Sequence, residues 1–207
     1  MTFHRDILRI DAGAIAEELE SNLRRDVRQT LRRSGAVVGI SGGLDSSVVL
    51  ALCARALGPE RVLGVMMPET ESGDDSIALA REVASRFGVK TLVEDITDAL
   101  TGFGCYTRRD EAIRRVFPEY DPSYACKISL PGDLLDTDAL NVFHLTIISP
   151  KGEERSSRLN VRDYLQIVAA SNFKQRSRMT MLYYHAELRN YAVIGTPNKN
   201  EHDQGFF

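Results

Sequence analysis

The chain has 207 residues, of which 43% are hydrophobic and 27% are charged. These proportions are typical of a globular protein and exclude a disordered or fibrous chain. The formal net charge of −3 excludes the strongly basic surface that binds nucleic-acid phosphates regardless of sequence. No apolar run approaches the roughly 20 residues of a membrane helix, and residues 1–6 lack the layout of a signal peptide. We therefore expect a cytoplasmic protein that binds neither nucleic acid nor a membrane.

Apolar periodicity divides most of the chain into helices and strands. Residues 11–34 carry an apolar residue at every fourth position from Ile15 to Leu31, which predicts one long helix that Gly35 ends. Beyond it, short apolar runs typical of buried parallel strands alternate with helical segments. The predicted strands are 36–40, 61–67, 90–96 and 191–195, and the predicted helices are 48–57, 75–87 and 175–190. This alternation predicts an α/β fold with a doubly wound parallel sheet and helices on both faces.

Residues 97–171 interrupt this alternation. Phe143, Leu145 and Ile147 take every second position ahead of a turn at 150–153, which predicts a β-hairpin. A short helix is expected at 107–116. We interpret the segment as an insertion, with no motif that assigns it chemistry, in a single domain that spans residues 1–207.

The three cysteines, Cys53, Cys105 and Cys126, are odd in number and show no Cys-x-x-Cys spacing. This pattern favours reduced thiols over a disulfide framework. Cys53 lies on the apolar face of a predicted helix, so we expect it to pack in the core.

A loop rich in glycine and serine follows the first predicted strand. Its residues are Ser41, Gly42, Gly43, Leu44, Asp45, Ser46 and Ser47. The two glycines allow a sharp turn that brings backbone N–H groups close to a ligand, and the helix that follows adds further free N–H groups. Such a loop is suited to bind phosphate. Because Asp45 would repel a bare phosphate, we expect Mg²⁺ to bridge this carboxylate to pyrophosphate.

A basic segment opens the predicted late helix. Lys174 and Arg178 lie four positions apart and share one helix face, with Arg176 between them. Because basic residues at a helix start are unfavourable for the dipole, they predict a nearby anion. A solvated basic turn is the alternative.

A third segment, residues 195–201, directly follows the last predicted strand. Ligands of open α/β sheets bind beyond the carboxyl ends of the strands, where the Ser41–Ser47 loop also lies. Glu201 and Asp45 could therefore share one Mg²⁺ ion. An ordinary turn is the alternative for this segment.

The pattern Ser-Gly-Gly-x-Asp-Ser after a buried strand resembles that of the PP-loop superfamily of ATP pyrophosphatases. Two later segments, Asn-Phe-Lys-Gln-Arg-Ser-Arg-Met at 172–179 and Gly-Thr-Pro-Asn-Lys-Asn-Glu at 195–201, make the chain similar to the NAD synthetase family. This similarity extends from residue 36 to residue 201 and leaves the inserted segment uncovered. It implies the adenine nucleotide alpha hydrolase-like fold, with ATP and Mg²⁺ as cofactors.

The resemblance also implies a reaction. In this family ATP adenylates the nicotinate carboxylate of deamido-NAD, and ammonia displaces AMP to give NAD, with release of pyrophosphate. The family implies a homodimer. The chain has no room for a glutaminase domain, so ammonia would arrive free or from a separate protein.

Carried over by position, the resemblance implies roles for individual residues. Asp45 and Glu201 would bind Mg²⁺, and Asp45, Lys174 and Arg176 would act in catalysis. The nucleotide would contact Gly39, Ser41, Gly42, Gly43, Leu44, Asp45, Ser46, Ser47, Met67, Arg176, Thr196 and Lys199.

Two alternatives stay open on the sequence alone. One is another PP-loop ligase or a tRNA-modifying enzyme, although the acidic net charge and the lack of a cysteine pair do not favour tRNA thiolation. The other is a nucleotide-binding subunit without activity. Relatives continue with a Lys-Tyr-Gly-Asp-Gly stretch where this chain ends at Gly205-Phe206-Phe207, so we expect the C-terminal part of the family domain to be missing.

Overall fold

The chain forms two compact units, which are described separately. The computed structural model describes residues 9–73, 75–130 and 142–203. The first unit comprises Met1–Thr97 and Arg178–Phe207, and the second comprises Asp98–Ser177. The expectations about residues 1–6 and 205–207 lie outside the described residues. The assignment of the chain to one domain with an insertion stays a prediction.

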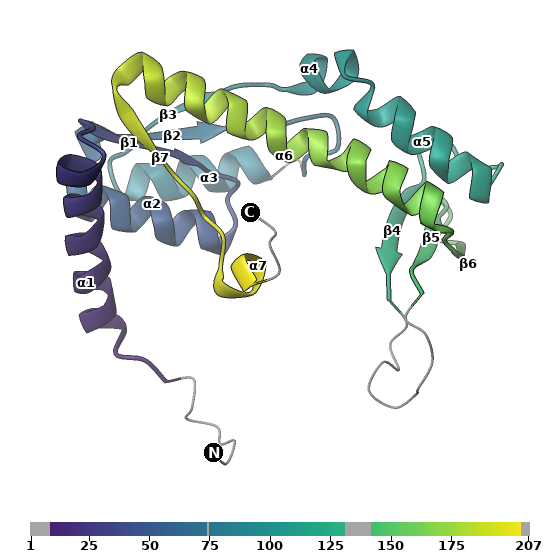
Figure 1. Cartoon of the computed structure of the whole chain (residues 1–207), viewed down its shortest axis with the longest axis horizontal. Coiled ribbons are helices and arrows are strands. Elements are labelled where there is room, and N and C mark those ends of the chain that lie inside the picture. Colours follow the sequence, from purple (N-terminus) through teal and green to yellow (C-terminus); the bar gives the residue numbers. More distant parts are fainter. Residues whose placement is uncertain (1–8, 74, 131–141, 204–207) are drawn as a thin grey trace. The chain divides into compact units, whose positions relative to one another are not determined.

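The first unit is built on a four-stranded parallel sheet with the strand order β3-β2-β1-β7 (Figure 1). Its strands are β1 (Gly35–Gly39), β2 (Val62–Met66), β3 (Lys90–Val93) and β7 (Tyr191–Ile194). Its helices are α1 (Ala12–Arg25), α2 (Leu44–Leu57), the short 3-10 turn η3 (Pro59–Arg61), α3 (Ser76–Arg86), α7 (Lys199–Asp203) and the last part of α6 (Val161–Arg189). The predicted parallel sheet is confirmed.

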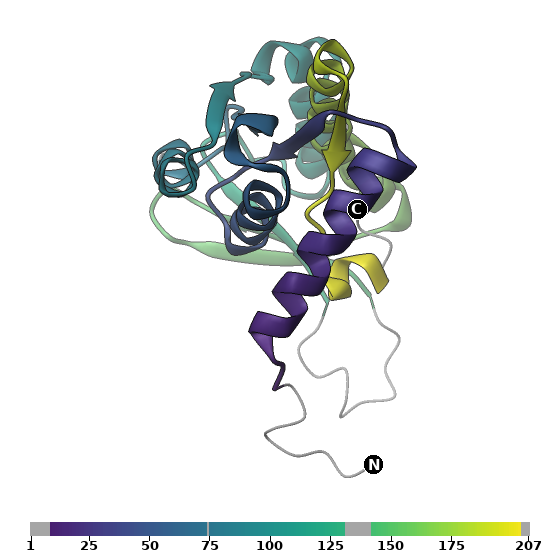
Figure 2. The ribbon, with the colours of Figure 1, turned by 90° about the vertical axis from the view of Figure 1, so that its left-hand side faces the viewer.

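The residues of β1 alternate between two layers of helices. Ala36 and Val38 are fully buried and join one hydrophobic cluster with Leu50 of α2. Gly39 faces the opposite way, and a Cβ on it would lie 3.3 Å from Leu182 of α6. Figures 1 and 2 show α2 and α3 on one face of the sheet and the end of α6 on the other. The doubly wound arrangement follows, as predicted.

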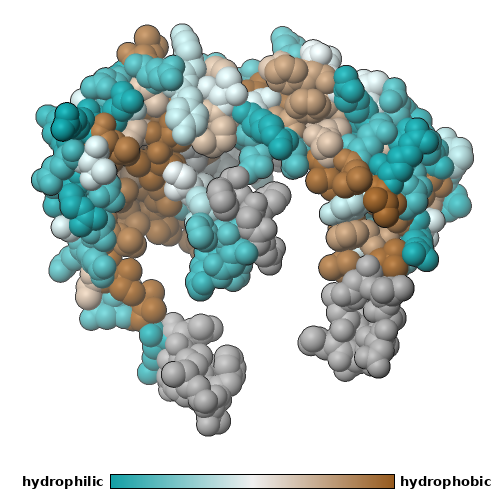
Figure 3. Space-filling model, in the orientation of Figure 1, coloured by the Kyte–Doolittle hydropathy of each residue, from teal (hydrophilic) through white to brown (hydrophobic). Residues whose placement is uncertain are grey.

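The first helix is shorter than predicted. Asp11 caps its N-terminus by accepting a hydrogen bond from the backbone of Ala14 at 3.1 Å. After α1 the chain passes into a π-helical turn, η2 (Asp26–Thr30). The predicted extent to residue 34 is wrong, because Arg32 adopts a left-handed φ of 54° that ends the helix. Exposed apolar side chains remain near the start of α1, where Figure 3 shows brown surface.

Gly35 serves the sheet rather than the helix end. It is the first residue of β1 and pairs with Tyr191 of β7. A Cβ on Gly35 would lie only 2.3 Å from the carbonyl oxygen of Arg61 and 2.6 Å from the Tyr191 ring. Glycine is therefore required here by close approach of the neighbouring chain.

The second unit packs helices against a three-stranded antiparallel sheet. Its helices are α4 (Thr97–Gly102), α5 (Cys105–Val116) and the first part of α6, and its strands are β4 (Ala125–Ser129), β5 (His144–Ile148) and β6 (Glu154–Arg158). Ile113 of α5, Leu145 and Ile147 of β5, and Ile167 of α6 form its core. Pairing of β5 with β6 around the turn confirms the predicted hairpin.

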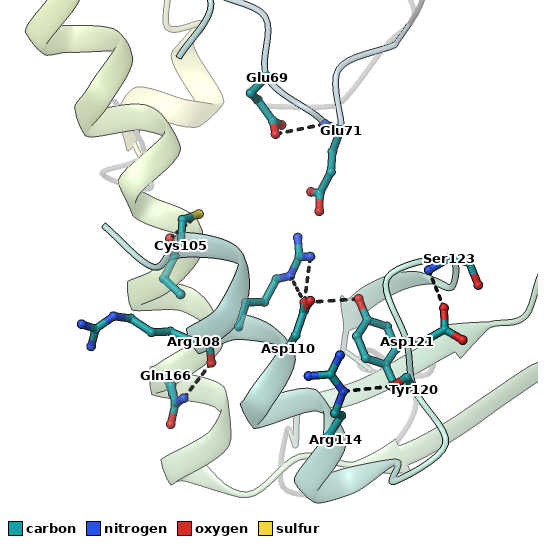
Figure 4. Close-up of polar contacts among 12 residues, drawn as sticks. Glu69, Glu71, Cys105, Arg108, Asp110, Arg114, Tyr120, Asp121, Ser123 and Gln166 are labelled. Atoms are coloured by element: carbon teal, nitrogen blue, oxygen red, sulfur yellow. Dashed lines mark hydrogen bonds and ion pairs between the residues drawn. The ribbon is translucent and has the colours of Figure 1, made fainter. Parts of the chain in front are cut away.

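Hydrogen bonds join a buried ion pair of α5, and the helix itself, to the loop that follows it. Arg109 Nη2 lies 2.8 Å from Asp110 Oδ1, and both side chains are largely buried. The Tyr120 hydroxyl donates to the same Asp110 oxygen at 3.5 Å, and Arg114 donates to the Tyr120 carbonyl oxygen at 3.1 Å (Figure 4). The Asp110 carboxylate is thus compensated by a cation and a hydroxyl, as a buried charge requires.

The late helix α6 is much longer than the predicted 175–190. It begins after Asn160, whose side chain accepts a hydrogen bond from the Asp163 backbone at 2.9 Å and donates to the Asp163 carboxylate at 2.6 Å. Arg115 of α5 donates to the same carboxylate at 2.7 Å. No glycine or proline interrupts the segment up to Arg189, so the capped helix continues. Among the described helices, none is long and apolar enough to cross a membrane.

The end of α6 is held to the edge strand of the parallel sheet. His185 Nε2 lies 2.7 Å from Oε1 of Glu94, which directly follows β3, and Arg189 Nη1 lies 3.0 Å from His185 Nδ1. Because a guanidinium can only donate, His185 accepts at Nδ1 and donates from Nε2 to Glu94. This chain of contacts fixes the orientation of the imidazole against the sheet.

The three cysteines should differ sharply in reactivity. Cys53 and Cys105 are buried, whereas Cys126 is partly exposed. Burial raises the pKa of the Cys53 thiol from 9.0 to about 12, so the reactive thiolate is scarce near neutral pH. We expect iodoacetamide to alkylate Cys126 in the folded chain and all three cysteines after denaturation, as counted by mass spectrometry. Alkylation of Cys53 in the folded chain as fast as Cys126 would contradict this packing.

Candidate nucleotide site

Two loops meet at the carboxyl edge of the parallel sheet. One runs from β1 into α2 and, together with the first turn of α2, contains the Ser41–Ser47 segment, and the other runs from β7 to α7 (Figure 1). The predicted helix start at residue 48 is wrong, because Gly43 is the N-cap and the helix begins at Leu44. The strands β1 and β7 are neighbours, whereas the chain continues from β1 to β2 on the other side. The strand order therefore reverses between β1 and β7, which is where open α/β sheets bind ligands.

The loop after β1 is organised by its own serine side chains. Ser46, which is buried, donates to the Gly43 carbonyl oxygen at 3.2 Å and accepts from the Ser41 backbone at 3.3 Å. Ser47 donates to the same carbonyl oxygen at 2.7 Å, and the Gly43 N–H donates to Ser41 Oγ at 3.3 Å. These bonds hold the loop in one shape before a ligand arrives, which lowers the entropic cost of binding.

Gly42 is the residue on which this shape depends most. Its φ of +80° lies in the left-handed region that disfavours residues with a Cβ. A Cβ would also lie 2.8 Å from the Leu79 Cβ and 2.9 Å from the Ser76 carbonyl oxygen of α3. By contrast, Gly43 has an ordinary φ of −76°. The loop can therefore pack on α3 only because position 42 is glycine.

The predicted partners Asp45 and Glu201 are connected through Asn198. The Asn198 side-chain amide donates from Nδ2 to Asp45 Oδ2 at 3.5 Å. The Asn198 backbone N–H donates to Glu201 Oε2 at 2.9 Å, and the Glu201 N–H donates to Asn198 Oδ1 at 3.0 Å. The last two bonds form a capping box at the start of α7. The structure thus brings the two loops together, as the carboxyl-edge argument predicts.

This donor set suits a hard divalent cation that also binds a ligand. Mg²⁺ in proteins takes one or two carboxylates and completes its octahedron with water and phosphate oxygens. Within residues 9–73, 75–130 and 142–203, no group of three His, Cys, Asp or Glu side chains could hold a metal by itself. Asp45 and Glu201 therefore suit a cation that also binds phosphate oxygens of a nucleotide, and they are too few to hold a cation with protein ligands alone.

The other predicted residues of the first unit lie around the same edge. Met67 is buried directly after β2, and its carbonyl oxygen accepts a hydrogen bond from Arg178 Nε at 3.4 Å. Gly39 ends β1 and is covered by Met67, whose Cε would lie 3.2 Å from a Cβ there. Thr196 follows β7 and is partly buried. Lys199 on α7 pairs with Asp203 at 2.6 Å and is largely exposed.

Lys174 and Arg176 belong to the second unit. The ammonium of Lys174 lies 5.6 Å from the centre of the Tyr106 ring, a cation–π contact between α6 and α5. The expectation that these residues open a helix is wrong, because α6 begins at Val161 and they lie in its interior. Residues in the interior of a helix do not face the positive end of its dipole, so these basic side chains do not require a nearby anion. Their catalytic roles stay predictions.

Two further residues, Arg178 and Asn198, belong to the site. The sequence places Arg178 on one helix face with Lys174, but its contact with Met67 depends on the packing of α6 against the end of β2. The sequence pattern assigns no role to Asn198. Its position three residues before Glu201 matches the spacing of a capping box, and that signal was available in the sequence.

The fold and the loop together define the class of protein: a parallel α/β domain with a glycine- and serine-rich loop at its strand-order reversal. Solved structures share this fold. An NH3-dependent NAD synthetase from Campylobacter jejuni superposes with a TM-score of 0.60 at 23% identity, covering 96% of this chain and 62% of that chain. An NMN synthetase from Francisella tularensis gives a TM-score of 0.60 at 18% identity, covering 96% and 60%. The fold is the adenine nucleotide alpha hydrolase-like one, as predicted.

The sequence identifies the family within this class. The model of the NAD synthase family matches residues 15–115 and 141–207, and the chain belongs to that family. An NH(3)-dependent NAD(+) synthetase of Mesorhizobium japonicum is 48% identical over 97% of this chain and 63% of its own length. The enzyme of the same name from Thermotoga maritima is 34% identical over 92% of this chain and 62% of its own length. The chain therefore spans about three fifths of these relatives.

Proposed function

We propose that the chain carries the ATP-binding part of an NH3-dependent NAD synthetase and catalyses the amidation of deamido-NAD. The observation that carries the proposal is the junction of the two loops through Asn198 and Asp45, in a chain 48% identical to a relative of that name. Other PP-loop ligases and tRNA-modifying enzymes are less favoured, because the family match extends over both loops and α6.

The proposal assigns ATP to the carboxyl edge of the parallel sheet. Backbone N–H groups of the Ser41–Ser47 loop and the start of α2 would bind the pyrophosphate of ATP. Asp45 and Glu201 would hold Mg²⁺, which when bound neutralises phosphate charge. Met67 and Gly39 would border the adenine, and Thr196 and Lys199 would lie beside phosphate or ribose. Arg176 and Lys174 are proposed to contact the acidic substrate or the nucleotide.

The proposed reaction needs no protein nucleophile. A carboxylate oxygen of deamido-NAD attacks the α-phosphorus of ATP, and the bond to pyrophosphate breaks. Ammonia then attacks the acyl carbon, AMP leaves with the shared oxygen, and one proton is released. The chain's contribution is to hold the two anionic reactants in line and to exclude competing water.

The proposal also covers the oligomeric state, the location and the source of ammonia. On the basis of the family resemblance, we propose a homodimer in the cytoplasm that receives ammonia free or from a separate protein. Size-exclusion chromatography with light scattering measures the first of these directly.

The test is a balance of products. Purified chain is incubated with Mg²⁺-ATP, deamido-NAD and ammonium, and NAD, AMP and pyrophosphate are quantified by chromatography. We expect equal amounts of the three products. NAD replaces deamido-NAD as the control substrate, because it has no carboxylate to adenylate, and it should release no AMP.

Two outcomes would contradict the proposal. AMP release that does not depend on deamido-NAD would exclude adenylation of that carboxylate. ATP binding without any NAD formation would leave the chain as a nucleotide-binding subunit. Nicotinate mononucleotide is tested in parallel, because the fold is shared with an NMN synthetase and does not by itself choose between the two acids.

A further inference from the structure

Asn198 makes side-chain contacts to both loops of the candidate site. Its amide nitrogen donates to Asp45 at 3.5 Å, and its amide oxygen accepts from the backbone of Glu201 at 3.0 Å. Its own backbone N–H binds the Glu201 carboxylate at 2.9 Å. Asp45 and Asn198 are 153 positions apart in the chain, so this contact joins the β1 and β7 loops directly.

No basic side chain in the described part of the chain forms an ion pair with either carboxylate. Among the described residues, Asp45 and Glu201 make no side-chain hydrogen bond or ion pair except those with Asn198. The nearest lysine in sequence, Lys199, is paired with Asp203. Each carboxylate uses one oxygen toward Asn198, and a carboxylate has two oxygens with about four lone-pair directions. Oxygen ligands for a cation therefore remain on both residues.

A neutral amide is the right kind of link between two metal-binding carboxylates. A lysine or arginine in its place would neutralise them and compete with the cation. An asparagine donates a hydrogen bond from its amide nitrogen without carrying charge. Its amide oxygen is held by the backbone N–H of Glu201 at the start of α7. The side chain is therefore oriented by one loop and acts on the other.

We propose that Asn198 is the positioning residue that sets Asp45 and Glu201 at the separation at which they share one divalent cation with ATP. The inference rests on the proposed function, in which that cation accompanies the nucleotide. Asn198 itself touches neither cation nor substrate. It limits the movement of Asp45 relative to α7, so its loss weakens cation binding more than nucleotide binding.

Two substitutions separate this role from helix capping. Asn198→Ser keeps a side-chain oxygen at the N-cap but cannot reach Asp45 with an N–H group. Asn198→Ala loses both contacts. Asn200→Ala is the matched control, since Asn200 lies on the same short helix, is exposed and has no hydrogen bond or ion pair among the described residues.

The direct readout is Mn²⁺ binding to the full chain with a non-hydrolysable ATP analogue, followed by electron paramagnetic resonance. We expect Asn198→Ser and Asn198→Ala to raise the Mn²⁺ dissociation constant about tenfold, as loss of a ligand-orienting contact does. The affinity for the analogue at saturating Mn²⁺ and the melting temperature of Asn198→Ser should stay near wild type. High Mg²⁺ should restore the rate of NAD formation in Asn198→Ser.

Each other outcome contradicts either the positioning role of Asn198 or the shared cation of the proposed function. Mn²⁺ binding by Asn198→Ser equal to wild type, with loss only in Asn198→Ala, would make Asn198 a helix cap alone. Unchanged binding in both variants would remove the positioning role and leave the proposed function standing. If wild-type chain binds the ATP analogue but no Mn²⁺, the shared-cation part of the proposed function fails together with this inference.

Discussion

Replacing Asp45 by asparagine should lower NAD formation by about a hundredfold or more while the chain stays folded. The substitution preserves shape but removes the charge that would hold the cation against the pyrophosphate. Loss of one electrostatic contact to a reacting phosphate costs on the order of 10²–10³ in rate. The fold should tolerate it, because Asp45 is exposed in the first turn of α2 and its interaction with the helix dipole contributes only ~0.3–1 kcal/mol.

The measurement is the initial rate of NAD formation against Mg²⁺ concentration, with circular dichroism as the check on folding. Asp26→Asn is the matched control, because Asp26 is an exposed carboxylate of the same unit that, among the described residues, forms an ion pair only with neighbouring Arg25. The control should retain the wild-type rate. An Asp45→Asn variant with the wild-type rate and Mg²⁺ dependence would exclude Asp45 as a metal ligand.

Replacing Gly42 by alanine should destabilise the first unit and abolish tight ATP binding. A left-handed φ costs a residue with a Cβ ~1–2 kcal/mol, and forcing a Cβ into a packed contact costs a further ~1–3 kcal/mol. The new methyl group would meet the backbone of α3 at Ser76, which has little freedom to move. Either the loop leaves α3 or α3 shifts, and both change the arrangement of the N–H groups that would bind phosphate.

Gly43→Ala is the comparison that isolates this effect. Its φ of −76° is ordinary, and its Cβ would meet only the flexible Ser41 hydroxyl at 3.3 Å. We expect the free energy of unfolding, measured by urea denaturation, to fall by about 2–5 kcal/mol in Gly42→Ala and by less than about 1 kcal/mol in Gly43→Ala. Equal losses in the two variants would show that the left-handed turn is not what shapes the loop.

Much of the first unit could be predicted from local patterns. Strands β1 and β2 are short apolar runs that are buried on both faces, as central strands of a parallel sheet are, and the helices α2 and α3 separate β1, β2 and β3 along the chain. The loop after β1 is equally local, because glycine and serine side chains act within a few positions of themselves. That both loops lie at one edge follows from strand direction alone.

The start of α6 is a feature that local sequence patterns do not predict. Residues 161–171, like residues 172–189, contain no glycine or proline, so composition alone marks no helix start near Lys174. The helix begins after Asn160 because Asn160 and Asp163 cap it while Arg115 of α5 binds Asp163. The last of these contacts depends on packing between separate helices. The basic cluster at Lys174 therefore lies inside a helix that begins at Val161, where the unfavourable dipole effect of a helix start does not arise.

Sequence alone therefore determined the α/β class, the glycine- and serine-rich loop after β1 and the edge of the sheet where chemistry is expected, since each depends on residues close together in the chain. Tertiary structure decided the rest. Only the meeting of segments 153 positions apart shows that Asn198 reaches Asp45. Only close packing shows that Gly35 and Gly42 are required by the Arg61 backbone and by α3. Such distances are set by the packing of whole elements, and no local pattern contains them.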